Sequence, residues 1–260
     1  MLYNALATQT RCNLSILSLF RFFALHSPTS YIKPSTSTMT RNFLEIFTLS
    51  PLENTNKEGA AITTEVTAEL QEILTILKDG QGSITMEFRQ DVTDSNTLLC
   101  IAGWESLADH DDLDIRGIVP RVLKKLLKRY EARDACYMYI DVRKFDVACD
   151  VLEVDVFNVK EAEKAVFQKE IDYRPDLVGA WHTVIPVPPL PKVMPTDPTE
   201  LSIIEAQKMG AERDLRNFTP ATWVTFSTPG TENLFTEFRV AVNGLVDEMK
   251  TGKYRKFLSG

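Results

Sequence analysis

The pattern of apolar and polar residues predicts a series of strands and helices that begins at residue 43. Residues 83–89 alternate strictly between apolar and polar side chains, which predicts a strand with one buried face. Apolar residues recur at helical spacing over 63–78 and predict an amphipathic helix. Residues 97–103 are almost all apolar and predict a strand buried on both faces. Because a strand over 43–49 precedes these elements, the order is strand, helix, strand, strand.

Further elements complete this unit and then repeat it. A short acidic helix after Gly103, a helix over 119–131 and a strand over 136–142 end the first series. A similar but weaker series begins at Val151. It consists of strands over 151–157, 177–185 and 223–227, helices over 160–172 and 232–249, and a short last strand over 254–258. The repetition predicts two α+β domains, over residues 41–145 and 146–260.

A proline-rich insertion, residues 186–220, interrupts the second series. Six prolines occur from Pro186 to Pro198, which predicts an extended surface connection and not a central strand. Asp197 as the cap, Pro198 at the first helical position and Glu200 three residues after the cap predict an additional helix. The insertion is either a lid over a pocket of the second domain or a strap that covers a sheet edge.

The N-terminal residues 1–40 differ in composition from the rest of the chain. The first acidic residue is Glu45, and residues 1–38 contain Arg and Lys among many Ser and Thr, which is typical of a mitochondrial transit peptide. Alternatively, translation begins at Met39, just before the first strand. In both cases we expect a disordered leader outside the fold. The protein is then cytoplasmic, or mitochondrial if the leader is genuine.

Composition and charge argue against a nucleic-acid partner, a membrane span and a metal or other cofactor. With a net charge of −7 over 260 residues, the chain lacks the basic surface that nucleic-acid binding requires. The longest apolar stretch, residues 14–25, is too short to span a membrane and contains Arg21. The four cysteines have no metal-binding spacing, so we expect free thiols in a reducing compartment. No metal or other cofactor is predicted, because H-x-x-x-H, P-loop and G-x-G-x-x-G patterns are absent.

Two segments carry a resemblance to a known domain. From Leu98 to His110, an apolar strand ends in Gly103 and Trp104 and is followed by Glu-Ser and a short helix. This segment resembles the antibiotic-biosynthesis-monooxygenase-like (ABM) domain. Residues 136–141 resemble the last strand of that domain in fungal proteins that carry it in tandem. The resemblance covers the first domain, whereas the second matches more loosely and has no evident Gly-Trp equivalent.

The resemblance implies a fold and a class of function. The fold is α+β, with two tandem ferredoxin-like repeats whose sheets pack face to face as an intramolecular dimeric α/β-barrel, a pseudo-dimer. The function is that of a small-molecule-binding protein or a cofactor-independent monooxygenase-like enzyme, with an aromatic or polyketide-like compound as ligand. The alternative is a non-catalytic pseudo-dimer that serves binding or assembly. Further homo-oligomerisation is compatible with both.

Three polar residues are candidates for catalysis, namely His182, Tyr137 and Tyr139. The two tyrosines share one face of the strand over 136–142, where their hydroxyls can polarise a quinone-like oxygen. Packing between the sheets is the alternative use of the same side chains. His182 follows Trp181 on a strand, so the two residues face opposite sides. A structural histidine that is hydrogen-bonded to the backbone is the alternative for His182.

Four residues are candidates for substrate binding, namely Trp104, Trp181, Arg89 and His110. Trp104 alternatively packs at the corner between strand and helix. Arg89 pairs either with Glu87 or with the carboxylate of a ligand. Acidic neighbours on both sides of His110 favour its protonated form. His110 is therefore either a general acid or an exposed residue of the helix.

Overall fold

A computed structural model describes residues 42–52, 62–144, 148–183, 187–217 and 221–259, so the predicted leader, residues 1–40, lies outside the described residues. The first series of elements comprises β1 (Asn42–Pro51), α2 (Thr64–Lys78), β2 (Ser83–Asp91), β3 (Leu98–Trp104), α3 (Leu107–Ile115), α4 (Ile118–Leu126) and β4 (Tyr130–Ile140). The second comprises β5 (Val151–Val159), α5 (Lys164–Asp172), β6 (Gly179–Trp181), α6 (Pro198–Asn217), β7 (Thr222–Ser227), α7 (Glu232–Val242) and β8 (Val246–Ser259).

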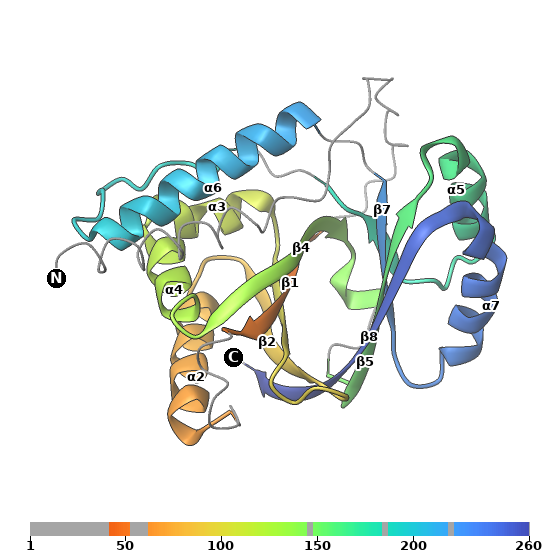
Figure 1. The fold of residues 1–260 in the computed structure, drawn as a ribbon, viewed down its shortest axis with the longest axis horizontal. Helices are drawn as coiled ribbons and strands as arrows, with labels where there is room; N and C mark the ends of the chain where they lie inside the picture. The colour runs from red at the N-terminus through yellow and green to blue at the C-terminus, as the bar shows by residue number, and fades with distance from the viewer. Residues whose placement is uncertain (1–41, 53–61, 145–147, 184–186, 218–220, 260) are drawn as a thin grey trace, which may run out of the picture.

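The strands form one antiparallel sheet in the order β4-β1-β3-β2-β8-β5-β7-β6. Figure 1 shows β8 running from the second half of this sheet to the first. The first half of the sheet consists of β1 to β4 and the second of β5 to β8. If the strands are numbered from one to four within each half, both halves have the order 4-1-3-2. The C-terminal end of β8 pairs with β2 and joins the two halves. At the other end, an isolated bridge between Met138 and His182 brings β4 close to β6. The sheet is therefore nearly closed, and the fold is a mixed α+β fold.

Alternation along the strands divides the apolar core into three layers. In β1, Leu44 and Ile46 belong to the layer inside the curved sheet, together with Val154 and Phe226 of the second half. Phe43 faces outward and packs with the helices of the first half. A third layer, which includes Phe157, Phe167, Phe235 and Phe238, packs the second half against its own helices.

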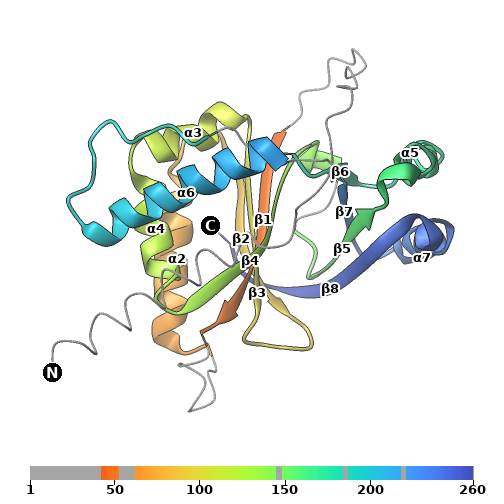
Figure 2. The same cartoon turned by 45° about the horizontal axis from the view of Figure 1, so that its top comes forward.

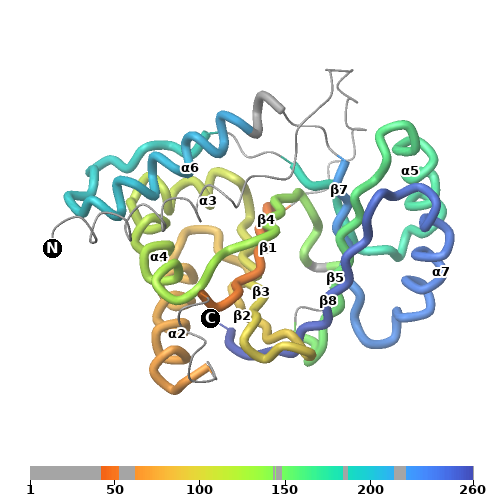
Figure 3. The backbone as a smooth tube through the Cα atoms, viewed as in Figure 1, coloured from red at the N-terminus to blue at the C-terminus, as the bar shows by residue number. Residues whose placement is uncertain are grey.

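Two groups of helices cover the outer faces of the sheet (Figure 2). Helices α2, α3 and α4 lie on the first half, and α5 and α7 lie on the second. Helix α6 follows β6 in the chain but packs against α4 of the first half, as the tube in Figure 3 also shows. The insertion therefore does not lie over the second domain, where a lid was one of its two predicted positions. Its predicted cap is confirmed, because Asp197 Oδ1 accepts hydrogen bonds from the backbone N–H groups of Thr199 and Glu200.

Some predicted boundaries are wrong, and the reason is long-range pairing. The helix predicted over 119–131 ends at Leu126, and β4 begins at Tyr130 because it pairs with β1. The closing helix predicted over 232–249 ends at Val242. Residues 246–259 instead form a strand of 14 residues that pairs with both β5 and β2. Of the strand predicted over 177–185, residues 184 and 185 lie outside the described residues, and within 177–183 the strand β6 comprises three residues.

Two observations on the described residues bear on the composition, although the apolar stretch over 14–25 lies outside them. No helix in the described part of the chain is both long and apolar enough to cross a lipid bilayer. Cys100 and Cys136 are buried free thiols, as expected. Burial raises the pKa of the Cys136 thiol to about 12, so this thiol stays protonated and unreactive at neutral pH.

Candidate functional site

A cluster of ionisable residues lies between the outer face of the first half-sheet and α3. Glu45 comes from the middle of β1, while His110 and Asp114 come from α3, one helical turn apart. Helix α3 begins directly after β3, because Ser106 caps it by accepting a hydrogen bond from the backbone N–H of Asp109 at 3.3 Å. This short connection holds His110 and Asp114 over the sheet. We call Glu45, His110, Asp111 and Asp114 the α3 cluster.

His110 is the centre of the α3 cluster. Its Nδ1 lies 3.2 Å from Asp111 Oδ1 and its Nε2 lies 3.9 Å from Glu45 Oε2. The ring meets Trp104 edge-on at 4.8 Å and Phe43 at 5.2 Å between centroids. His110 is only 6% exposed, so the expectation of an exposed helix residue is wrong. The helix presses this face against β1 and β3, and that contact buries the histidine.

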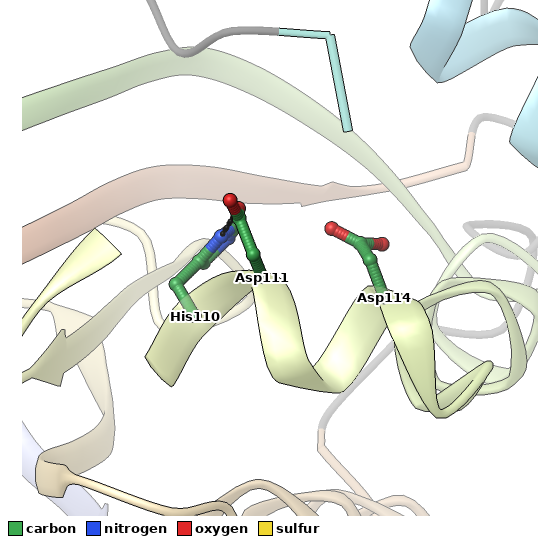
Figure 4. A group of neighbouring side chains, drawn as sticks. All are labelled: His110, Asp111 and Asp114. Atoms are coloured by element: carbon green, nitrogen blue, oxygen red, sulfur yellow. Dashed lines mark hydrogen bonds and ion pairs between the residues drawn. The ribbon is translucent and has the colours of Figure 1, made fainter. Parts of the chain in front are cut away.

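Asp114 is buried without a full set of partners. It is 4% exposed, and its Oδ2 accepts no hydrogen bond from the described residues. Figure 4 shows the Asp114 carboxylate and the side chains of His110 and Asp111 projecting from the same side of α3. Burial raises the pKa of Asp114 to about 7, with His110 opposing the shift and Glu45 and Asp111 adding to it. A buried carboxylate with an open acceptor is unusual in a structural role.

Burial and neighbouring charges also perturb the other members of the cluster. Burial raises the pKa of Glu45, although His110 and a hydrogen bond from the Tyr137 hydroxyl oppose the shift. Burial by itself would lower the pKa of His110. Its hydrogen bond to Asp111 and the charges of Glu45 and Asp114 overcome this effect, so the pKa of His110 is raised. The cluster contains three carboxyl groups and one imidazole, and so has an excess of potential negative charge.

Aromatic side chains surround the cluster, including both of the predicted catalytic tyrosines. Tyr137 lies opposite Glu45 in the β1–β4 ladder and stacks on Phe43 at 6.3 Å. Tyr139 meets Phe43 edge-on at 5.6 Å and is 39% exposed. Trp104 is 2% exposed, and its Nε1 has no partner among the described residues. The structure therefore brings Tyr137, Tyr139, Trp104 and His110 together on one face, as candidates of a single site.

His182 lies at the edge of this group and is held by the backbone. Its Nδ1 accepts a hydrogen bond from the backbone N–H of Tyr137 at 3.0 Å, which is the structural arrangement that the sequence left open. Burial lowers the pKa of His182 to about 4. His182 is therefore neutral at physiological pH. In this position it links β6 to β4 of the other half.

Trp181 and Arg89 lie away from the α3 cluster. Trp181 Nε1 donates a hydrogen bond to Gln168 Oε1 at 2.9 Å, and its ring packs against Phe167 in the second half. Arg89 is fully buried and its Nε donates to Glu87 Oε1 at 2.7 Å, which is the pairing predicted as one of its two alternatives. The structure therefore does not bring these two predicted ligand-binding residues to the site.

A narrow pocket reaches Asp114 from the surface. Its other walls come from residues 187–217, which we call the cover segment and which comprise the proline-rich stretch and α6. The lining residues are Asp114, Pro188, Pro189, Leu190, Pro191, Ile204, Gln207 and Lys208. The cavity measures about 10 Å³, roughly the space that one water molecule needs. The backbone N–H of Lys192 donates to the carbonyl of Ile115 at 2.8 Å and holds the cover segment to the end of α3.

Sequence reasoning missed Glu45, Asp111 and Asp114 as site residues. Glu45 gave a usable signal, since it is an acidic residue in the middle of an otherwise apolar strand. Asp111 and Asp114 gave none, because the acidic stretch 109–114 resembles any solvated helix face. The ligand atoms of His110, Asp111 and Asp114 lie within 4.8 Å of one another. This set contrasts with the prediction of no metal-ligating group, which was based on spacing in the sequence.

Comparisons with known proteins identify the fold. No protein-family profile matches the sequence, and no curated protein matches it significantly. A protein of Fusobacterium nucleatum and one of Lactobacillus acidophilus, both assigned provisionally as monooxygenases, superimpose with TM-scores of 0.55 and 0.52 at 9% and 8% identity. An anthrone oxidase-like protein superimposes with a TM-score of 0.51 at 12% identity.

These similarities extend over most of each chain. They cover 85%, 85% and 86% of this chain and 94%, 96% and 94% of the Fusobacterium, Lactobacillus and anthrone oxidase-like proteins. At such low identity the likeness concerns the fold alone. The chain therefore shares the fold of these three structures, a mixed α+β fold with one nearly closed antiparallel sheet.

Proposed function

We propose that this protein binds a small aromatic compound at the α3 cluster and acts on it as a monooxygenase-like enzyme. One observation carries the proposal. Asp114 Oδ2 and Trp104 Nε1 are buried polar atoms without partners among the described residues, and both belong to the group around His110. A buried acceptor and a buried donor without partners cost free energy unless something satisfies them. A ligand with hydroxyl or carbonyl groups would do so.

The surroundings favour a neutral, hydroxylated aromatic ligand. Phe43, Tyr137 and Tyr139 offer ring faces and edges, which suit an aromatic compound. A ligand hydroxyl would donate to Asp114, and a carbonyl would accept from Trp104. The carboxyl groups of Glu45 and Asp114 disfavour an anionic ligand in a buried site. This combination is consistent with phenolic or polyketide-like compounds.

Entry of such a ligand requires movement of the cover segment, because the pocket holds about one water molecule. Lys124 of α4 forms ion pairs with Asp197 and, at 3.5 Å, with Glu200 at the start of α6. These side chains are partly exposed, and exposed ion pairs are weak. The cover segment would therefore open without disturbing the sheet. In this proposal the insertion is a lid over the first half.

The architecture also supports the proposal that the chain is an internal pseudo-dimer. The halves of the sheet have the orders β4-β1-β3-β2 and β8-β5-β7-β6, which are equivalent when strands are numbered within each half. This is the strand order that two tandem ferredoxin-like repeats would have. Joining β2 to β8 and bridging β4 to β6 would let one chain close the barrel that separate subunits otherwise form.

The experiment measures ligand binding and oxygen consumption. Wild-type protein is titrated with hydroxylated aromatic compounds, including anthrone, because one structural neighbour is an anthrone oxidase-like protein. A bound ligand raises the melting temperature, since it stabilises only the folded state. Asp114→Asn should weaken binding about ten- to a hundredfold, the effect of losing a hydrogen bond to a charged group.

Asp112→Asn is the matched control. Asp112 lies on the same helix but pairs with the exposed Arg116 at 3.3 Å, so this substitution should leave ligand affinity unchanged. Equal loss of affinity in both variants, or binding that is indifferent to Asp114, would refute the proposed site.

A second candidate function is a non-catalytic pseudo-dimer that serves binding or assembly. The small volume of the pocket favours it, as do the phenylalanines that fill the equivalent region of the second half. Wild-type protein that binds aromatic compounds without consuming oxygen would support this alternative. Oxygen consumption that depends on both the compound and Asp114 would support the enzyme.

A further inference from the structure

The α3 cluster has the composition of a metal site as well as of a polar pocket. His110, Asp111 and Asp114 each offer one ligand atom, and these atoms lie within 4.8 Å of one another. Asp114 is 4% exposed, and its Oδ2 has no hydrogen-bond partner in the described part of the chain. Figure 4 shows that the Asp114 carboxylate projects toward the side where His110 and Asp111 meet. A bound cation is one partner that would satisfy a buried carboxylate oxygen without a donor.

We propose that His110, Asp111 and Asp114 bind a divalent transition-metal ion. The inference deepens the proposed function, because it concerns the same site and supplies a group that the site otherwise lacks. One nitrogen and two carboxylate ligands would leave coordination positions open for water or a substrate oxygen, as in catalytic metal sites.

The distances suit such an ion after a small adjustment. His110 Nδ1 and Asp111 Oδ1 are 3.2 Å apart, which matches two neighbouring ligands that each lie about 2.1 Å from one ion. Two ligands of one zinc-sized ion are at most roughly 4.4 Å apart. The widest separation in the cluster is within 4.8 Å, so a rotation of one side chain closes the difference. Asp114 is able to rotate this oxygen because no described residue bonds it.

The surroundings of His110 orient its ring for this role. If Nδ1 binds the ion, Nε2 carries the proton and faces Glu45 Oε2 at 3.9 Å. A metal-binding histidine nearly always presents its other ring N–H to a carboxylate or carbonyl, which fixes the tautomer and the ring orientation. Glu45 is itself held by the Tyr137 hydroxyl. In this arrangement β1 supplies the carboxylate of Glu45, and α3 supplies His110 and the proposed metal position.

The donor set selects the class of ion. An imidazole nitrogen favours Mn²⁺, Fe²⁺ or Zn²⁺ over Mg²⁺ and Ca²⁺, which prefer oxygen ligands only. The cluster does not favour ions that prefer thiolate ligands, because it contains no cysteine. Cys100 lies on β3 and Cys136 on β4. A divalent ion would also supply the positive charge that stabilises an anionic form of a hydroxylated substrate, which three carboxyl groups alone would repel.

The test measures binding of the metal alone. Full-length protein is treated with a chelator, exchanged into clean buffer and titrated with MnCl₂ and ZnCl₂ by calorimetry. The electron paramagnetic resonance spectrum of bound Mn²⁺ serves as an independent readout. We expect one ion per chain, with Mn²⁺ or Zn²⁺ bound at least about tenfold more tightly than Mg²⁺. Asp114→Asn should weaken Mn²⁺ binding at least about tenfold, whereas the control Asp112→Asn should not change it.

The outcomes separate this inference from the proposed function. Absence of saturable Mn²⁺ or Zn²⁺ binding, or binding that Asp114→Asn leaves unchanged, would overturn the metal site. If aromatic ligands still bind the chelator-treated protein in that case, the proposed function stands alone. If the metal binds with the expected dependence on Asp114 but no aromatic compound does, the metal site stands and the proposed ligand class is wrong. A circular dichroism spectrum of Asp114→Asn identical to that of the wild type shows that the variant is folded.

Discussion

Each half of the sheet has an acidic residue in the middle of its first strand, but the two residues have different partners. Glu45 in the middle of β1 faces α3, and Asp155 in the middle of β5 faces α7. Arg239 of α7 binds the Asp155 carboxylate through two hydrogen bonds, of 2.8 and 2.9 Å, and Thr251 donates a third at 2.6 Å. On the first half, Glu45 lies 3.9 Å from His110 Nε2 and accepts a hydrogen bond from the hydroxyl of Tyr137.

The two halves differ in how completely their buried carboxyl groups are paired. In the second half, Glu153 and Asp155 are matched by Arg239 and Lys253, so charge and hydrogen bonds are satisfied. A satisfied buried network holds a helix on a sheet and offers nothing to a ligand. In the first half, the α3 cluster has one imidazole and three carboxyl groups, and Asp114 Oδ2 accepts no hydrogen bond from any described residue. The outer face of the sheet therefore carries a satisfied network in one half and, among the described residues, an incompletely paired cluster in the other.

The largest expected effect comes from breaking the satisfied network. Arg239→Met should lower the free energy of unfolding by about 3–5 kcal/mol, because it leaves the buried Asp155 carboxylate without its cation. Denaturant unfolding followed by circular dichroism measures the change. Lys250→Met removes an exposed pair with Asp134 and serves as the control, with an expected change within about 0.5 kcal/mol. A loss below about 1 kcal/mol for Arg239→Met would show that this network is not structural.

The next effect concerns His182, which joins the two halves and is kept neutral. The folded-state pKa is about 4 against an ordinary value of 6.5, so the unfolded chain binds a proton in this range and the folded protein does not. Stability from this residue is therefore full above pH 6.5 and falls as the pH drops to 4. Compared with His182→Asn, which keeps an acceptor for Tyr137 but does not titrate, wild type should lose up to about 3 kcal/mol. Parallel pH profiles of the two proteins would contradict this account.

A pair of isosteric substitutions tests the contrast directly. Asp155→Asn should lower the free energy of unfolding by about 1–3 kcal/mol, because it weakens charged hydrogen bonds. Asp114→Asn, measured in a chelator, should leave it unchanged or raise it by up to about 1 kcal/mol, because the lost charge was buried and incompletely paired. Chemical unfolding of both variants at neutral pH measures the difference. Equal destabilisation would mean that Asp114 has a structural partner.

The smallest effect on stability is expected at the cover segment. Lys124→Met removes the ion pairs to Asp197 and Glu200 and should leave the melting temperature unchanged. Stopped-flow measurement should show several-fold faster association of an aromatic ligand, because the cover segment opens more readily. Lys125→Met, which removes a similar pair with Glu72 away from the cover segment, should change neither quantity. Identical association rates in all three proteins would exclude the lid.

Local sequence accounted well for elements whose burial pattern is self-contained. The helix predicted over 63–78 corresponds to α2, whose five buried residues are the predicted apolar stripe. The strands predicted over 43–49 and 83–89 lie within β1 and β2. The capped helix after Asp197 also forms as predicted. In each case the spacing of side chains or the chemistry of the cap is sufficient, because the relevant neighbours are close in the sequence.

The candidate site was predicted only in part. The structure brings the candidates Trp104, Tyr137, Tyr139 and His110 to one face, whereas Trp181 and Arg89 lie elsewhere. Pairing of β1 with β4 and docking of α3 decide which polar residues share a face. Neither contact is encoded in the spacing of nearby residues.

The amino-acid sequence by itself determined the elements whose pattern is local, such as β1, α2, β2 and the cap of α6, since periodicity and capping act over a few residues. Only the tertiary structure decided that residues 246–259 form a strand and that α6 lies on the first half. It also decided that His110 and Asp114 are enclosed and not solvated. The physical reason is that an apolar face on a helix or strand must pack against another surface. The sequence pattern shows that face, but contacts between distant parts of the chain decide which surface covers it.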